Sequence, residues 1–349
     1  MARLFLVLLA VMVVGSACAE PPTPAPVLPP QAPPTPPAPL SAPDFSPTPA
    51  VIVSPSALPT ATPAHTSTPA APPSPTPSPT PTPAVLIGAG DIAVCGVDKD
   101  EKTADVIERQ LILYPQAVVM AIGDTVNESG RMVEYRSCFT PSWGRFLNRI
   151  RPVPGNHDLM TEQGAPYYAY FGAAAGAPGL GYYSFNLGDW HIVALNSNCD
   201  QIACGSASYQ ARWLREDLQK NRQRCTLLYW HHPRFASGIQ GSVGTVYHFW
   251  RIAYEYGAEV VVSGNDHHYE RFAPQDPDGR LDLQRGIRQF VVGTGGAELR
   301  GWGTIKPNSE VRHNHTHGVI QFKLYPDRYE WEFLPIGGAF RDSGAGECH

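Results

Sequence analysis

The chain has 349 residues and a formal net charge of −5, and its 26 basic residues are scattered among 31 acidic ones. Nucleic-acid binders concentrate Lys and Arg on one face, so this charge pattern excludes a nucleic-acid-binding interface. The first 83 residues lack the composition of a folded domain, which leaves residues 84–349 for folding. That length suits one sizeable domain. No feature of the sequence indicates an oligomeric state.

The N-terminus is typical of an export signal. One arginine is followed by an apolar run at residues 4–14, which is too short to span a bilayer, and then by small residues. Two processing routes stay open. Cleavage after Ala19 would make 1–19 a signal peptide, whereas a Gly-Ser-Ala-Cys lipobox would leave Cys18 lipidated and the protein attached to a membrane.

Residues 20–83 are dominated by Pro, Ala, Thr and Ser. Such a segment has too few apolar side chains to offset the entropy cost of ordering, so we expect a disordered, extended linker of polyproline II character. It would hold a globular head away from a membrane or wall, or form the free arm of a secreted enzyme. Either interpretation predicts a secreted or cell-surface protein.

Cysteine usage agrees with export. Seven cysteines are present, and six of them follow the export signal. An even number in an exported chain favours disulfides over thiol chemistry or metal binding. The pairs that we expect are Cys199 with Cys204, which closes a short loop, Cys95 with Cys138, and Cys225 with Cys348.

The folded part alternates apolar strand-like runs with amphipathic stretches, which predicts an α/β protein. In the helix expected at 206–221, one face carries Tyr209, Trp213, Leu214 and Leu218. We expect further helices at 101–113 and 246–256, hairpins at 182–196 and 318–334, and strands at 84–90, 116–122, 225–230, 259–263 and 290–292.

Several of these strands end in polar residues that suit metal binding. The carboxyl ends of strands form the edge at which α/β sheets bind ligands, and carboxylate, amide and imidazole groups bind hard and borderline cations. One histidine would mean little, but five such loops predict a metal site. The loops carry Asp91, Asp124, Asn156 with His157, His231 with His232, and Asn265 with His267.

These loops resemble the ordered signature blocks of the calcineurin-like metallophosphoesterases, in particular a bacterial secreted subgroup of the purple acid phosphatase-like branch. The resemblance runs from about Val85 to the C-terminus. It implies a four-layer α/β/β/α sandwich, of α/β or α+β class, with its site at the strand ends. The matching blocks are Gly90-Asp91, Gly123-Asp124, Gly155 to Asp158, His231 to Pro233, and Gly264 to Arg271.

The resemblance also implies an enzyme with two metal ions, which hydrolyses phosphate monoesters by attack of a metal-bound hydroxide. Phosphodiesters or nucleotides are the alternative substrates. Asp91 and His267 would bind the first metal. Asp124 would bridge both metals, while Asn156 and His231 would bind the second.

Three further residues receive roles from the same resemblance. His157 would lie beside the phosphate and stabilise charge or protonate the leaving oxygen, with Asp158 orienting its imidazole. His232 would face the substrate or support the neighbouring ligand.

Two positions depart from the pattern of this branch. Asn127 replaces a metal-binding tyrosine, and Asn265 replaces a histidine, although its amide oxygen can still bind a cation. The loss of a phenolate and an imidazole favours Mn, Mg or Ca over Fe or Zn, and predicts that no purple charge-transfer band forms. Either the enzyme holds its metals weakly, or the chain is a degenerate relative that acts as a non-catalytic surface binding module.

Overall fold

The computed structural model describes residues 82–349. The predicted signal peptide, the lipobox at Cys18 and nearly all of the predicted linker lie outside the described residues. Within 82–349, no helix combines the length and apolar character needed to cross a membrane.

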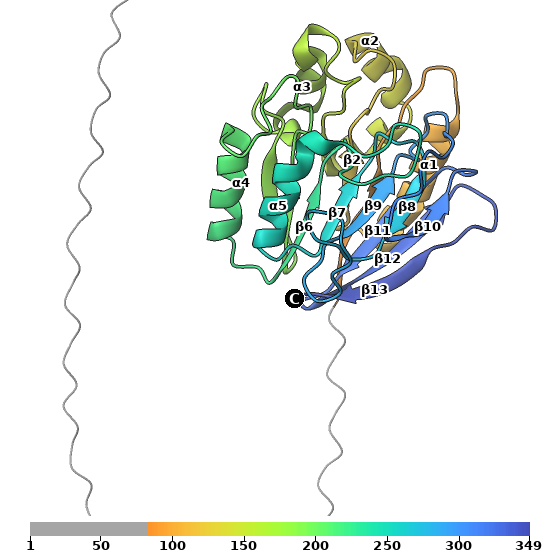
Figure 1. The fold of residues 1–349 in the computed structure, drawn as a ribbon. Coiled ribbons are helices and arrows are strands. Elements are labelled where there is room, and N and C mark those ends of the chain that lie inside the picture. Colours follow the sequence, from red (N-terminus) through yellow and green to blue (C-terminus); the bar gives the residue numbers. More distant parts are fainter. Residues whose placement is uncertain (1–81) are drawn as a thin grey trace, which may run out of the picture. The chain divides into compact units, whose positions relative to one another are not determined.

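Two mixed β-sheets form the centre of the fold (Figure 1). In the first sheet, β1, β2 and β3 run parallel, while β11, β12 and β13 continue it as an antiparallel meander. The strand order is β13-β12-β11-β1-β2-β3. The bounds are β1 (Ala84–Ala89), β2 (Val118–Ile122), β3 (Ile150–Val153), β11 (Gly318–Leu324), β12 (Arg328–Pro335) and β13 (Ser343–Glu347).

The second sheet has the order β10-β8-β9-β7-β6-β5-β4. Its central strands β5, β6, β7 and β9 are parallel, and antiparallel strands complete both edges. The bounds are β4 (Tyr183–Leu187), β5 (Trp190–Ala194), β6 (Cys225–Tyr229), β7 (Val260–Ser263), β8 (Tyr269–Phe272), β9 (Arg288–Val292) and β10 (Ser309–His313).

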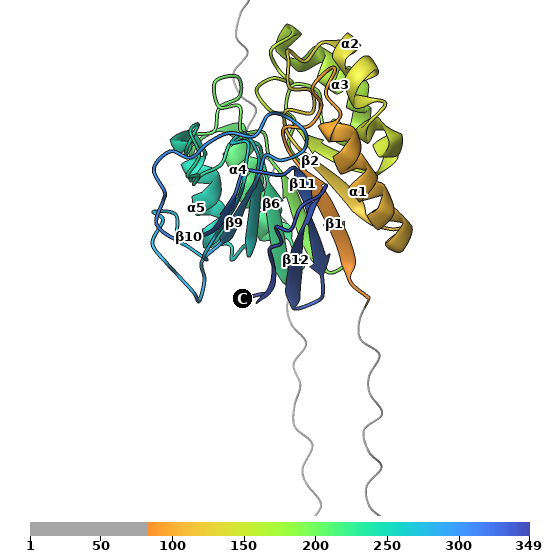
Figure 2. The same ribbon diagram turned by 90° about the vertical axis from the view of Figure 1, so that its right-hand side faces the viewer.

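Helices cover the outer faces of both sheets. Figure 2 shows α1 on one side of the strands and α4 with α5 on the other. The α-helices are α1 (Lys99–Leu113), α2 (Met132–Glu134), α3 (Ala165–Phe171), α4 (Tyr209–Lys220) and α5 (Tyr247–Glu255). The chain also forms a π turn at Tyr135–Phe139 and 3₁₀ turns at Trp143–Arg149, Glu162–Gly164, Gly172–Ala175 and Gly244–Val246.

The packing of β6 shows how the layers form. Side chains along a strand alternate between its two faces. Leu227 and Tyr229 therefore join the core between the sheets, while Leu228 and Trp230 join the core beneath α4 and α5. Both faces of this strand are buried, which explains its continuous apolar run. The predicted four-layer sandwich is confirmed.

All three predicted disulfides are present: Cys95–Cys138, Cys199–Cys204 and Cys225–Cys348. Only the second closes a short loop, with a separation of 5 residues. The other two tie together segments that are 43 and 123 residues apart. These cysteines therefore act as cross-links of the fold.

Asp100 makes the stability depend on pH. It lies in the first turn of α1 with 2% of its surface exposed, and its Oδ1 atom has no hydrogen-bond partner. Burial raises the pKa of this carboxyl to about 7; Ser142 opposes that rise and Glu101 adds to it. An unfolded aspartate ionises near pH 4. The folded state thus binds the extra proton, and its stability should fall as the pH rises from about 4 through about 7.

We therefore expect Asp100→Asn to remove much of this pH dependence. Above pH 7 the variant should exceed the wild type in free energy of unfolding by ~4 kcal/mol, because the buried charge is absent. Urea denaturation between pH 5 and pH 8 measures this difference. Asp105→Asn, on the exposed side of the same helix, is the matched control. Parallel pH curves for Asp100→Asn and the wild type would contradict the prediction.

Candidate metal centre

The five polar loops meet at one edge of the fold. Asp91, Asp124 and Asn156 follow β1, β2 and β3 of the first sheet, whereas His231 and His267 follow β6 and β7 of the second. Ligand atoms of Asp91, Asp124 and His231 lie within 4.8 Å of one another, and all three residues are buried. The two sheets together therefore build a compact cluster of carboxylate and imidazole groups.

Tight turns at the strand ends aim these side chains inward. Asp91, Asp124 and Asn265 adopt the left-handed conformation, with φ values of 58°, 45° and 66°. Among residues other than glycine, Asp and Asn tolerate this region best. Such strain concentrates at functional sites. The turn geometry and the ligand chemistry thus favour the same residue types.

Two histidines each approach a carboxylate through Nε2. His231 Nε2 lies 3.3 Å from Asp124 Oδ2, and His267 Nε2 lies 3.1 Å from Asp91 Oδ1. Each Nδ1 lies 2.8 Å from a backbone carbonyl oxygen, that of Ile122 for His231 and that of Glu298 for His267. A carbonyl oxygen can only accept a hydrogen bond, so Nδ1 carries the hydrogen and donates the bond. This arrangement directs Nε2 to the centre, as in histidines that bind metals.

Some of the buried oxygen and nitrogen atoms that meet here have no hydrogen-bond partner. Asp91 Oδ1 and His231 Nε2 are buried and have no hydrogen-bond partner among the described residues, although both have close neighbours. Leaving such atoms unpaired is costly unless something else binds them. A cation would satisfy both the carboxylates and the imidazoles, so the residues present fit a metal centre.

The charges of the cluster are strongly coupled. Burial raises the pKa of Asp124, but the charges of His231 and His157 outweigh burial and lower that pKa to about 2. Burial lowers the pKa of His231, but the carboxylates of Asp124 and Asp91 outweigh it and raise the pKa to about 9. Without a cation, a proton on His231 thus balances the carboxylates. Metal binding should release protons here.

His157 lies at the open side of the cluster. Its backbone N–H donates to Asp124 Oδ1 over 2.9 Å, and its Nδ1 donates to the backbone carbonyl of Glu128 over 2.8 Å. Nε2 lies 3.8 Å from Asp124 Oδ2, and 29% of the side chain is exposed. The imidazole is thus fixed at one nitrogen and free at the other, on the side from which a ligand can enter. Asn156, next to it, is also only partly buried.

Asp158 is placed differently from the prediction. Its carboxylate accepts from the backbone N–H groups of Thr125 (3.1 Å) and Gly155 (2.9 Å), and from the Tyr135 hydroxyl (2.7 Å). No hydrogen bond joins it to the nearby His157 ring, which the Glu128 carbonyl holds instead. Burial and the charge of Asp124 raise the pKa of Asp158 to about 6. Its position braces the turn after Asp124 against the turn that carries Asn156.

The remaining predicted residues surround the cluster. His232 Nδ1 lies 2.9 Å from the Ser197 hydroxyl, and burial together with the charge of His231 lowers the pKa of His232 to about 3. It is therefore neutral at pH 7. The backbone N–H of Asn265 donates to Asp91 Oδ2 over 2.8 Å. Asn127 follows Asp124 by three residues, and its side-chain nitrogen is buried without a hydrogen-bond partner.

Sequence reasoning missed the groups that hold the histidines. The backbone carbonyls of Ile122, Glu128 and Glu298 fix three imidazole rings. Every residue has a carbonyl, so these positions carry no sequence signal. Ser197, whose hydroxyl lies 2.9 Å from His232 Nδ1, was also missed, because a polar residue after a strand is usually part of an ordinary loop.

A family model for calcineurin-like phosphoesterases matches residues 85–269. The chain belongs to the calcineurin-like phosphoesterase family. Members of this family bind a dinuclear metal centre, which agrees with the Asp and His cluster described above. The matched segment begins in β1 and ends at the first residue of β8, so it contains all five loops of the centre.

Individual relatives are acid phosphatases by name. Purple acid phosphatase 15 of Arabidopsis thaliana is 28% identical over 148 residues, which cover 37% of this chain and 27% of that protein. Human acid phosphatase type 7 is 26% identical over 194 residues, which cover 45% of this chain and 44% of that protein. The chain thus matches less than half the length of these relatives.

A solved structure of a purple acid phosphatase from yellow lupin seeds has the same fold. It aligns with a TM-score of 0.64 at 18% identity, covering 75% of this chain and 53% of that one. At this level of identity the likeness concerns the fold alone.

The position of Asn127 allows a spectroscopic prediction. We expect Asn127→Tyr, loaded with ferric iron, to gain a visible charge-transfer band that the ferric wild type lacks, because only the variant offers a phenolate ligand. Absorption spectra of both proteins test this. Asn127→Phe adds the ring without its oxygen and is the matched control. A band in the wild type, or in the Phe variant, would contradict the prediction.

Proposed function

We propose that this chain is an exported, metal-dependent phosphoesterase that hydrolyses phosphate monoesters. The observation that carries the proposal is the convergence of Asp91, Asp124 and His231, in which the buried atoms Asp91 Oδ1 and His231 Nε2 have no hydrogen-bond partner among the described residues. Family membership gives the reaction class. The names of the relatives, all acid phosphatases, favour monoesters as substrates.

Cations bound here would supply Lewis-acid activation of the phosphoryl group and of a water molecule. Asp91 and His267 would hold one cation. Asn156 and His231 would hold a second, with Asp124 between the two. Asn265 would add an amide oxygen where related sites have an imidazole. This oxygen-rich set favours manganese, magnesium or calcium over iron or zinc.

His157 is the residue best placed to act on the substrate. Its Nδ1 is occupied by the Glu128 carbonyl, so only Nε2 is available at the open side. As an imidazolium, the ring can donate from Nε2 to a phosphoryl oxygen, or transfer that proton to the oxygen of the leaving alcohol. Asp124 Oδ2 lies 3.8 Å from this nitrogen. Neutral His232 would support this side of the site without transferring a proton.

Export is part of the same proposal. Three disulfides fit a protein that matures in an oxidising compartment. The N-terminal sequence supports two mature forms, one beginning after Ala19 and one attached to a membrane through lipidated Cys18. Mass spectrometry of the mature N-terminus distinguishes them, and an intact Met1 would contradict export by either route.

The decisive experiment combines metal analysis of protein purified without chelator with hydrolysis of an aryl phosphate in the presence of Mn²⁺, Mg²⁺, Zn²⁺ or Ca²⁺. Two bound ions together with metal-dependent turnover support the proposal. Faster turnover of diesters or nucleotides would change the substrate class. Folded protein that binds no metal and hydrolyses nothing would overturn the proposal, and would favour the non-catalytic binding module that Asn127 and Asn265 suggest.

A further inference from the structure

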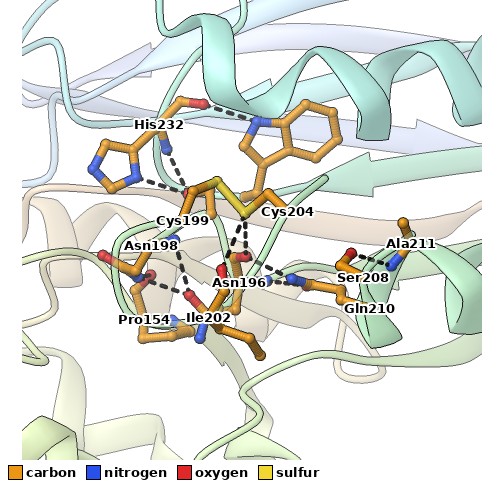
Figure 3. The surroundings of a disulfide bond; sticks show 12 residues. Pro154, Asn196, Asn198, Cys199, Ile202, Cys204, Ser208, Gln210, Ala211 and His232 are labelled. Carbon is orange, nitrogen blue, oxygen red and sulfur yellow. Dashed lines mark hydrogen bonds between the residues drawn. A yellow bond between two sulfur atoms is a disulfide. The ribbon is translucent and has the colours of Figure 1, made fainter. Parts of the chain in front are cut away.

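A disulfide-closed loop connects two of the five metal-site loops. The loop comprises residues 196–204 and follows β5, and the Cys199–Cys204 disulfide closes its second part into a ring directly after Asn198. Figure 3 shows that Pro154 and His232 approach it from different segments of the chain. Pro154 lies two residues before Asn156, and His232 directly follows His231. The loop therefore contacts the two segments that carry Asn156 and His231. These are the ligands that are proposed to bind the second metal and not the first.

Asn198 makes the first of these contacts. Its Nδ2 donates to the backbone carbonyl of Pro154 over 3.0 Å and to Asn196 Oδ1 over 2.8 Å. Asn198 is 1% exposed and Asn196 is 2% exposed, so water does not compete for these bonds. Both Nδ2 bonds are therefore made in a buried setting, whereas Asn198 Oδ1 has no hydrogen-bond partner among the described residues. The Asn198 side chain fixes the start of the turn that carries Asn156.

Ser197 makes the second contact. Its Oγ accepts from the backbone N–H of His232 over 2.9 Å and lies 2.9 Å from His232 Nδ1. One hydroxyl thus holds both the backbone and the ring of the residue after His231. Ser197 is 2% exposed. Removal of this hydroxyl would leave a buried N–H without its partner, which is unfavourable.

The loop is itself held from two sides. The disulfide joins its end to its middle, and Gln210 of α4 holds its start. Gln210 Oε1 accepts from the Asn196 N–H over 2.8 Å, and Gln210 Nε2 donates to the Asn196 carbonyl over 2.9 Å. The Asn198 carbonyl accepts from the N–H groups of Gln201 and Ile202, both inside the disulfide ring. Opening that ring would therefore release the Asn198 side of the loop first.

The first-metal ligands have other supports. Asp91 is held by backbone bonds to the turns after β2 and β9, and His267 by the Glu298 carbonyl. No hydrogen bond of the described residues joins either ligand to residues 196–204. The loop can therefore act on one half of the centre alone.

We propose that Ser197 and Asn198 are positioning residues for the second metal, and that the Cys199–Cys204 disulfide keeps them in place. This proposal rests on the proposed function for the identity of the centre. Groups that orient metal ligands typically contribute 10–100-fold to metal affinity. Reduction of this disulfide would therefore lower the affinity for the second metal selectively. The site would then be sensitive to the redox state of its surroundings.

Side-chain variants test the positioning role. Calorimetric titration of the metal-free protein with Mn²⁺ should show two binding events. In Ser197→Ala and Asn198→Asp, one event should weaken by about 10–100-fold while the other stays unchanged. Ser208→Ala is the matched control, because Ser208 caps α4 through Ala211 N–H and touches neither metal loop. It should lower the melting temperature and leave both affinities unchanged. Equal weakening of both events, or none, would overturn the proposal.

Disulfide variants test the role of the ring. Cys199→Ser with Cys204→Ser should weaken the same binding event. Cys225→Ser with Cys348→Ser also removes one disulfide, but Cys225 begins β6, at the end of that strand far from His231. This control should lower the stability of the protein, but it should not weaken one Mn²⁺ binding event more than the other. If both double variants change Mn²⁺ binding alike, the disulfide has only a general stabilising role.

Hydrogen exchange of the metal-free protein keeps this test independent of the proposed function. Ser197→Ala should speed exchange of the His232 amide, and Asn198→Asp should speed exchange at 155–158, while Ser208→Ala should change neither. These results would support the positioning role even if the wild type bound no metal, an outcome that would defeat the proposed function alone. Unchanged exchange in both segments would overturn the positioning role.

Discussion

Asp124→Asn should reduce aryl phosphate hydrolysis by about 1000-fold or more, which corresponds to ~4 kcal/mol in the activation barrier. The two carboxylate oxygens of Asp124 face different groups: Oδ1 accepts from the His157 N–H, and Oδ2 lies 3.3 Å from His231 Nε2. An asparagine of the same shape replaces one oxygen by an amide donor and removes the charge. Neither cation of a bridged pair would keep its shared ligand.

Steady-state kinetics with saturating Mn²⁺ and metal stoichiometry measure this effect. Asp217→Asn is the matched control, because Asp217 is also largely buried and bonded to a histidine, His191, but lies on α4 outside the centre. It should retain the wild-type kcat. An Asp124→Asn variant with full activity would refute the bridged arrangement, whereas equal losses in both variants would indicate general destabilisation.

The sequence indicated that Asp91, Asp124 and His231 would lie together, because its signals are local. Each ligand follows a buried strand directly, so the apolar run and the polar residue after it can be read together. Two edge strands, β10 and β13, were missed for the opposite reason. β13 (Ser343–Glu347) alternates between exposed and half-buried residues and contains no large apolar side chain. Its pairing with β12 determines its conformation, and that partner is not visible in the local pattern.

The errors concern contacts between distant segments. Asp158 is adjacent to His157 in sequence, yet it bonds to Thr125 and Tyr135, 33 and 23 residues away. Tyr209 fits the apolar face of its helix by spacing, but it is the first residue of α4 and is 81% exposed. The periodicity of the sequence shows on which face of a helix a residue lies. It does not show whether the neighbouring layer of the fold extends far enough to cover that residue. The side chains at a helix end therefore need the tertiary structure.

At the metal centre the loops approach one another closely, and this limits the size of the residues that lie next to the proposed ligands. A Cβ atom on Gly264 would lie 2.7 Å from Asp91 Oδ2, and one on Gly155 would lie 2.1 Å from Asp124 Oδ1. Glycine at position 264 lets the loop after β7 of the second sheet approach a ligand of the first sheet, and glycine at position 155 lets the turn after β3 approach the ligand after the neighbouring strand β2. The geometry of the centre thus depends on absent side chains as much as on the ligands themselves.

Gly123→Ala should therefore disrupt the centre although it changes no ligand. Gly123 has a φ of +76°, and a Cβ there would lie 2.5 Å from His231 Nδ1 and 2.6 Å from His231 Cγ. His231 is fully buried and held by the Ile122 carbonyl, so it cannot move aside freely. We expect a loss of several kcal/mol in the free energy of unfolding. Mn²⁺ affinity should fall with it.

The loss in Gly123→Ala has two causes, the strained backbone conformation and the contact with His231, and Gly257→Ala separates them. Gly257 has a φ of +70°, but no heavy atom lies within 4 Å of its added Cβ. This control carries the conformational cost alone, about 1–2 kcal/mol, and should bind Mn²⁺ as the wild type does. Urea denaturation and Mn²⁺ titration of both variants measure the difference. If the two variants match in stability and affinity, the cost of Gly123→Ala is conformational and His231 tolerates the contact. A selective loss in Gly123→Ala would instead mean that the ring of His231 is held where the gap between the sheets leaves no space for a methyl group.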